Sequence, residues 1–142
     1  MRGELELLAK REGIANKTMF TGFIDDKRLV EALKSSNAVV IPSRFEPFGI
    51  TALEAMAAGA PVVVSRVGGL AEIVDDRIDG LEVEPQNSRS IAEGLVRVLN
   101  DPSMAAQLAA RAGEKVKSYT WGSAAEATLR VYGRAVRDSR YG

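Results

Sequence analysis

The segment from Val39 to Ser65, VVIPSRFEPFGITALEAMAAGAPVVVS, most constrains the fold because two apolar runs flank a helix-forming run. A short β-branched run such as 39–41 is typical of a strand buried on both faces of a parallel sheet. The helix-forming TALEAMAA ends at Gly59-Ala60-Pro61, and a second apolar strand at 62–64 follows. The segment therefore predicts a strand–helix–strand unit of an α/β protein.

The loop before this helix brings acidic and backbone groups together. Pro47 stiffens the loop and Gly49 turns it sharply. The N–H groups from Gly49 to Thr51 have no intrahelical partners, and a helix end at the carboxyl edge of a parallel strand is a ready phosphate site. Glu54 lies about 6 Å along the axis from the helix start and on roughly the same face, whereas Glu46 stays in the loop.

Two carboxylates beside a phosphate site indicate the kind of ligand. Glu46 and Glu54 are eight residues apart. Carboxylates accept hydrogen bonds from vicinal hydroxyls, which a ribose or a hexose offers. The predicted ligand is therefore a nucleotide-sugar.

Composition excludes several function classes. The 142 residues suffice for one domain, and the 46% apolar and 27% charged contents are those of a soluble globular protein. A net charge of zero favours neither nucleic acid nor an anionic membrane. The absence of histidine excludes a His general base, a Ser-His-Asp triad and a His-ligated metal. The absence of cysteine fits a cytoplasmic location, and neither a membrane-spanning stretch nor a signal peptide is expected.

The remaining chain alternates between helical and strand patterns. Asp25 is expected to cap the second helix, and Leu129 and Tyr132 lie at helical spacing in the last one. Strands and helices in alternation predict a parallel α/β sheet, with C-terminal helices from about 102 to 138. The expected elements are a helix at 4–12, a strand at 17–23, helices at 25–36 and 70–74, a strand at 80–84, and helices at 90–99, 102–119 and 121–136.

PSRFEPFGITALEAMAAGAPVV resembles the E-x7-E signature of the family 4 retaining glycosyltransferases, which include glycogen synthases and sucrose-phosphate synthases. The similarity extends through VGGLAEIV, Asp79-Gly80-Leu81 and Tyr119-Thr120-Trp121, and so covers essentially the whole chain. The resemblance implies the C-terminal, donor-binding domain of a GT-B enzyme, with a Rossmann-like parallel sheet flanked by helices.

The resemblance also implies roles for the two acids and the helix start. It assigns Glu54 to the ribose hydroxyls of the donor, and Glu46, the candidate catalytic residue, to the donor sugar near the reacting carbon. Backbone N–H groups of Phe48, Gly49 and Ile50 would bind sugar hydroxyls, and those of Ile50 and Thr51 the phosphates.

Three further residues are candidates for contact with the donor. Ile24, in the loop after the expected strand at 17–23, would lie against the nucleobase. Gly68 and Gly69 form either a plain tight turn or a surface against the donor. No metal and no cofactor besides the nucleotide-diphosphate sugar are expected.

The family comparison also exposes a gap. The donor domain of these enzymes normally begins with two more strands, which carry a Gly-Arg pair and a Gly-x-Gly, and a downstream Lys completes a cationic clamp. In the strand order 3-2-1-4-5-6 these strands are central. The chain is thus expected to be a fragment that lacks its first two strands, with 18–23 separated from 39–41 unless the strands close up in another order. The acceptor site, and any peripheral membrane contact, would belong to a missing N-terminal part.

Three hypotheses remain at this point. The first is the donor-binding part of a retaining glycosyltransferase that transfers a hexose from a nucleotide-diphosphate sugar, inactive as an isolated chain. The second is a catalytically silent nucleotide-binding or assembly subunit that needs another chain. The third, an epimerase or phosphorylase, is disfavoured because those reactions usually need a histidine or a cofactor lysine motif. The base, the sugar and the acceptor are not determined by the sequence.

Overall fold

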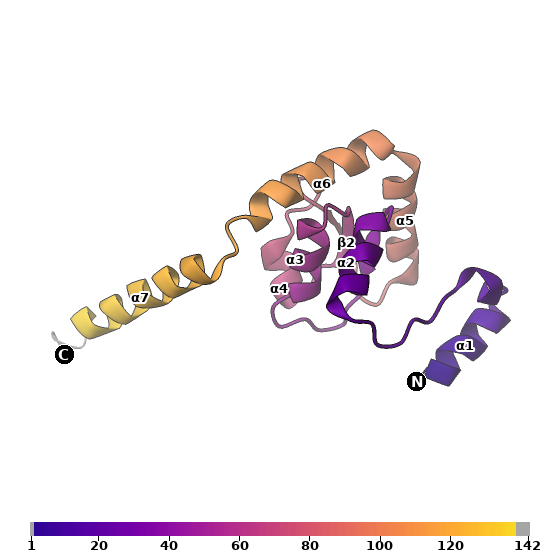
Figure 1. The fold of residues 1–142 in the computed structure, drawn as a ribbon, viewed down its shortest axis with the longest axis horizontal. Helices are drawn as coiled ribbons and strands as arrows, with labels where there is room; N and C mark the ends of the chain where they lie inside the picture. Colours follow the sequence, from indigo (N-terminus) through magenta and orange to yellow (C-terminus); the bar gives the residue numbers. More distant parts are fainter. Residues whose placement is uncertain (1, 139–142) are drawn as a thin grey trace.

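The computed structural model describes residues 2–138 and contains a three-stranded parallel sheet with helices on both faces (Figure 1). The α/β fold class predicted from the alternating patterns is confirmed. The elements are α1 (Arg2–Arg11), a 3₁₀ turn η1 (Ala15–Lys17), α2 (Asp26–Ser35), β1 (Val39–Ile41), α3 (Ile50–Ala57), β2 (Val62–Ser65), α4 (Gly68–Ile73), β3 (Leu81–Val83), α5 (Ser88–Asn100), α6 (Pro102–Val116) and α7 (Trp121–Asp138).

The strands lie in the order β1-β2-β3, with Ile41 opposite Val64 and Ser65 opposite Val83. All four residues of the central strand β2 are buried. The edge strand β1 differs from the prediction of burial on both faces, because Val40 is 37% exposed. The reason is that α5 packs over β2 and β3 and leaves the Val40 side of β1 partly uncovered.

Two apolar clusters fill the space on either side of the sheet. One contains Val62, Val64 and Met56 and is covered by α2, α3 and α4. The other contains Val63 and Leu81 and is covered by α5 and the first half of α6. Helix α6 contributes to both clusters, with Ala112 in the first and Ala105 and Leu108 in the second. It therefore ties the two layers together.

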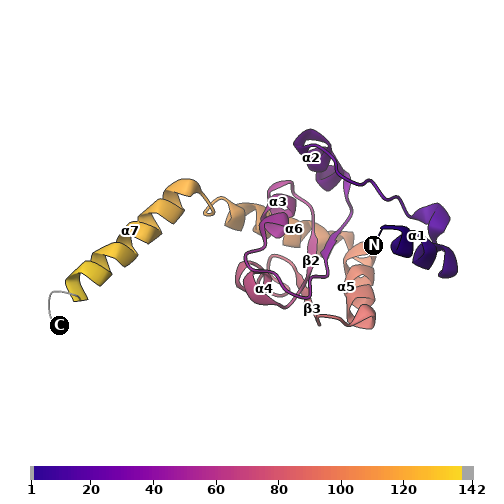
Figure 2. The same ribbon diagram turned by 90° about the horizontal axis from the view of Figure 1, so that it is seen from below.

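The strand predicted at 17–23 is wrong. After η1 the chain runs as an irregular connection to α2 (Figure 2), and Met19 and Phe23 are 85% and 98% exposed. A strand needs a neighbouring edge for its N–H and C=O groups, and within residues 2–138 the sheet comprises β1, β2 and β3 alone. The segment is held to α1 by Arg2, whose Nη2 donates to the carbonyl oxygen of Phe20 at 3.2 Å.

The helices after the sheet differ in whether the apolar residues at their predicted helical spacing are buried. Val98 and Leu108 are buried as expected. In α7, by contrast, no residue is buried, and Leu129 and Tyr132, which lie at helical spacing, are exposed. The helix projects away from the sheet (Figure 1), and none of its residues is buried. None of the helices in residues 2–138 combines the length and apolar character needed to cross a membrane.

An ion pair with one buried partner, Asp79, holds α6 to the loop before β3. Lys115 Nζ donates to Asp75 Oδ2 and to Asp79 Oδ2, each at 2.8 Å. Asp79 is only 3% exposed, and its Oδ1 accepts the Asp75 N–H at 2.8 Å. Burial alone would lower the pKa of Lys115, but its hydrogen bonds and attraction to the two aspartates raise that pKa above the ordinary 10.5.

We expect Lys115→Met to lower the free energy of unfolding by about 3 kcal/mol at pH 7, because it leaves Asp79 buried without its counter-ion. Since the folded pKa of Lys115 is raised, its contribution is fully present below pH 10.5 and is lost as the pH rises through the folded value. Urea unfolding of the wild type and the variant, followed from pH 7 to above pH 10.5, measures both effects.

The matched control is Lys117→Met, since Lys117 forms an exposed pair with Glu114. Exposed pairs contribute about 0–1 kcal/mol, so this variant should stay near wild type. Equal losses in the two variants would contradict a specific role for the pair with Asp79.

Candidate functional site

The loop that follows β1 enters α3 through Gly49, which has a left-handed backbone with φ 98°. L-residues rarely adopt this conformation, whereas glycine does so readily. A side chain there would also be crowded, since a Cβ at Gly49 would lie 3.0 Å from Ile73 Cδ1 and 3.2 Å from Leu70 Cδ2. Gly49 is thus required both for the turn and for the approach of the loop to α4.

The start of α3 presents two unpaired amides. The N–H groups of Ala52 and Leu53 both donate to the carbonyl oxygen of Gly49, at 3.0 and 3.2 Å. The backbone N–H groups of Ile50 and Thr51 have no hydrogen-bond acceptor among residues 2–138, and both residues are exposed. Open amides at a helix start attract anions through their hydrogen bonds and the helix dipole.

The third amide of the predicted site is occupied, so the expectation of an entirely bare helix end is wrong at this position. Glu46 Oε1 accepts the N–H of Gly49 at 3.0 Å. The carboxylate therefore lies at the helix start, next to the open amides. The sequence signal for this bond was an acidic residue three positions before the glycine that caps the helix, a spacing at which a side chain can reach forward to a backbone N–H.

The glycine pair predicted as a tight turn or a donor contact forms the first two residues of α4, and its contact with a donor stays a prediction. Gly69 is buried, and its N–H donates to the carbonyl oxygen of Glu46 at 2.9 Å. A Cβ at Gly69 would overlap the backbone of Phe48, and one at Gly68 would overlap the carbonyl of Glu46. The pair thus packs directly against the site loop.

Glu54 lies on another side of α3. It is exposed and lines a groove of about 370 Å³ with Asp26, Leu29, Val30, Leu33 and Lys34 of α2. Ile24 is half-buried and immediately precedes Asp25, whose side chain caps α2 by accepting the N–H of Arg28 at 2.9 Å. The predicted cap is therefore confirmed.

The predicted site residues thus form two groups on either side of the α3 start. Glu46, Phe48 and Gly49, predicted to contact the sugar, lie toward α4, against Gly68 and Gly69, for which only contact with the donor or a tight turn was predicted. Those predicted to contact the nucleoside lie toward α2: Glu54 and Ile24. The amides of Ile50 and Thr51 lie between them at the beginning of α3.

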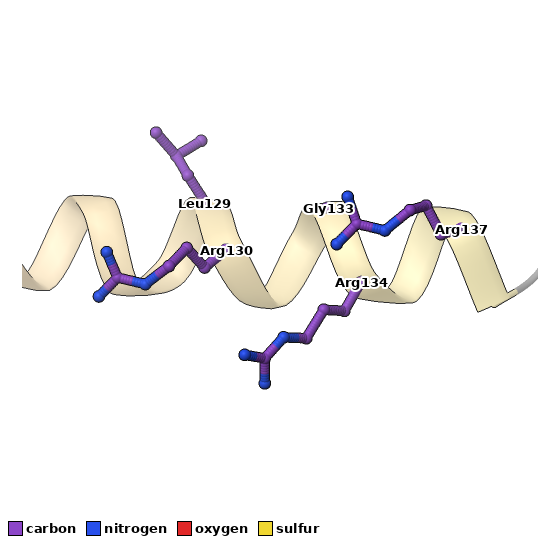
Figure 3. A pocket seen from close by; sticks show the side chains of 5 residues that line it. All are labelled: Leu129, Arg130, Gly133, Arg134 and Arg137. Carbon is purple, nitrogen blue, oxygen red and sulfur yellow. The ribbon is translucent and has the colours of Figure 1, made fainter.

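Other polar side chains and surface hollows lie outside the two groups of predicted site residues. Burial and the nearby Asp76 raise the pKa of Glu82 on β3, while Arg66 opposes the shift. Across the described part of the chain, no group of three or more acidic side chains is arranged to hold a metal ion. A shallow hollow beside Arg130, Arg134 and Arg137 (Figure 3) is lined by α7 alone, so it cannot enclose a ligand.

Comparison with known sequences supports a common family. Residues 1–116 match the family described as glycosyl transferases group 1. An uncharacterized glycosyltransferase of Methanocaldococcus jannaschii is 47% identical over 133 residues, which are 93% of this chain and 34% of that protein. A glycogen synthase of Mycobacterium tuberculosis is 38% identical over 93% of this chain and 32% of its own length.

Solved structures have the same fold. The sucrose-phosphate synthase of Thermosynechococcus elongatus superposes with a TM-score of 0.85 and 34% identity, covering 96% of this chain and 35% of its own. Anabaena HepE, solved in complex with UDP and glucose, gives a TM-score of 0.78 and 29% identity, covering 82% and 31%. The chain thus spans about a third of the length of these relatives.

We expect Gly49→Ala to lower the free energy of unfolding by about 2 kcal/mol, because alanine is strained at this φ and its Cβ would press against Ile73. Urea unfolding measures the change. Gly113→Ala in α6 is the control, since a Cβ there meets nothing within 4 Å and alanine favours a helix by about 0.5–1 kcal/mol. A Gly49 variant as stable as this control would contradict the requirement for glycine.

Proposed function

The chain belongs to the group 1 glycosyl transferases, and from this we propose that it binds a nucleotide-diphosphate sugar as the donor-binding part of a retaining hexosyltransferase of GT-B architecture. The observation that carries the proposal is the pair of open amides at Ile50 and Thr51, with a carboxylate on either side of them. Anionic phosphates suit the amides, and polyhydroxylated groups suit the carboxylates.

The two groups of residues suggest how the donor would lie. Its diphosphate takes the amides of Ile50 and Thr51 at the start of α3. Its ribose extends to Glu54 in the groove beside α2, with the base near Ile24. Its sugar extends the other way, toward Glu46, which holds the Gly49 N–H, and toward the N–H group of Phe48. The UDP and glucose bound to Anabaena HepE, a similar fold, support a donor of this class.

The proposed reaction is transfer of the hexose to an acceptor with retention at the anomeric carbon. The nucleoside diphosphate leaves from the same face that the acceptor approaches. Negative charge develops on the leaving phosphate, and the amino end of α3 stabilises it through open N–H groups and the helix dipole. The leaving diphosphate takes up the acceptor proton, so this scheme requires neither a histidine nor a metal ion.

A second candidate function is that of a nucleotide-binding or assembly subunit without catalytic activity of its own. The observation in its favour is the exposed apolar side of α7, with Trp121 93% exposed. Such a surface fits association with another polypeptide. Both candidates retain donor binding and differ in turnover.

We expect calorimetry to detect binding of at least one of UDP, GDP and ADP to the chain. Glu54→Ala should weaken that binding about thirtyfold, because the loss of charged hydrogen bonds to a ribose costs about 2 kcal/mol. Glu93→Ala on α5, on the opposite side of the sheet, is the control and should bind as wild type does. Equal affinity of the wild-type and Glu54→Ala proteins would remove Glu54 from the site.

We expect the 142-residue chain alone to transfer no sugar when it is incubated with UDP-glucose, GDP-mannose or ADP-glucose and a panel of sugar and polyol acceptors. Product analysis by mass spectrometry measures transfer, and release of nucleotide measures hydrolysis. Robust turnover would contradict the prediction that acceptor binding lies in another part of the enzyme.

A further inference from the structure

Helix α4 is in contact with the site loop at three points. The N–H of Gly69 donates to the carbonyl oxygen of Glu46 at 2.9 Å. The Cα of Phe48 lies 2.6 Å from the place that a Cβ of Gly69 would occupy. Leu70 and Ile73, from the same helix, lie against Gly49. The loop from 46 to 49 therefore contacts α4 through Glu46, Phe48 and Gly49.

This geometry argues against direct contact of Gly69 with a ligand. Gly69 is buried, and it has a single N–H, which the carbonyl of Glu46 already occupies. Its missing side chain has a different consequence. Any Cβ there would push the Phe48 backbone outward, because the overlapping atoms belong to the main chain and cannot rotate away.

The Glu46 carboxylate depends on the same contact. The Gly69 bond holds the main chain of Glu46, and the side chain of Glu46 then reaches the Gly49 N–H at 3.0 Å. A shift of the Glu46 backbone would move this carboxylate relative to the amides of Ile50 and Thr51. Small displacements of this kind matter, because recognition of hydroxyls depends on hydrogen-bond distance and angle.

We propose that Gly69 is a positioning residue, which recognises the sugar half of the donor indirectly by holding Glu46 and Phe48 against α4. The inference rests on the proposed donor-binding function. It assigns the specificity for a sugar conjugate over the bare nucleoside diphosphate partly to a glycine that touches neither. In the proposed arrangement the diphosphate is bound by the amides of Ile50 and Thr51, whereas Gly69 donates its hydrogen bond to Glu46.

The first test needs no ligand. Amide spectra from nuclear magnetic resonance are compared for wild type, Gly69→Ala and Glu46→Ala. We expect the Gly49 resonance in Gly69→Ala to move toward its position in Glu46→Ala, because both changes weaken the Glu46–Gly49 bond. Gly94→Ala is the matched control, since its Cβ would lie 2.7 Å from Val83 Cγ1, in the core under α5 and away from the loop. An unmoved Gly49 resonance in Gly69→Ala, or an equal movement in Gly94→Ala, overturns the proposal.

The second test compares two ligands by calorimetry: whichever of UDP, GDP and ADP binds best, and its glucose conjugate. We expect Gly69→Ala to lower the affinity for the conjugate about tenfold more than the affinity for the nucleoside diphosphate. A purely structural defect, as in Gly94→Ala, would lower both alike. Equal losses in Gly69→Ala therefore overturn the proposal.

If Gly69→Ala does not fold, amide hydrogen exchange of the wild-type chain replaces it. The glucose conjugate should slow exchange at Gly69 and Gly49 together, more than the nucleoside diphosphate does, because both amides donate to Glu46. Slowing at Gly49 alone would contradict the coupling. Absence of any nucleotide binding by wild type would contradict the proposed function, while the ligand-free spectra would still decide whether Gly69 positions Glu46.

Discussion

The contact between the loop after β1 and the start of α4, at the carboxyl edge of the sheet, organises the candidate site. In a parallel pair, successive strands end on the same side, and the register of Ile41 with Val64 makes β1 and β2 end nearly level. The chain leaving β1 and the start of α4 after β2 therefore meet. Their backbones approach so closely that Gly68 and Gly69 leave no space for a Cβ, and the Gly69–Glu46 hydrogen bond joins them.

The core supports this contact from below. The face of α3 toward the sheet presents small residues, Ala52 and Ala55, which are fully buried and let the helix lie close to β1 and β2. Leu70 and Ile73 of α4 belong to the same apolar cluster and also touch Gly49. Packing of the core thus sets the distance between the two helices whose starts form the site. Lys115 adds a further restraint by holding the loop after α4 to α6.

Some parts of the described chain pack against neighbouring helices, and other parts bury little surface. The helix start of α3 has neighbours on both sides, α4 beside Glu46 and α2 beside Glu54. The connection at 18–24 and the last helix bury little: Phe23 and Trp121 are almost fully exposed. The proposed donor site lies in a part that packs against neighbouring helices, so its geometry follows from the chain itself. In a family whose members here are about three times as long, we propose that the acceptor is bound elsewhere in the enzyme.

The sequence alone was sufficient for the features that depend on neighbours along the chain. The strand–helix–strand unit at 39–65, the cap at Asp25 and the turn at Gly49 follow from local propensities, and the family followed from Glu46, Glu54 and the motif around them. Features that need a partner distant in sequence were decided by the tertiary structure. The strand predicted at 17–23 did not form because alternation requires an edge to pair with, and Leu129 and Tyr132 stayed exposed because helical spacing requires a surface to face. The same holds for Gly69, whose close contact with Phe48 joins residues 21 positions apart, a proximity that only the folded chain produces.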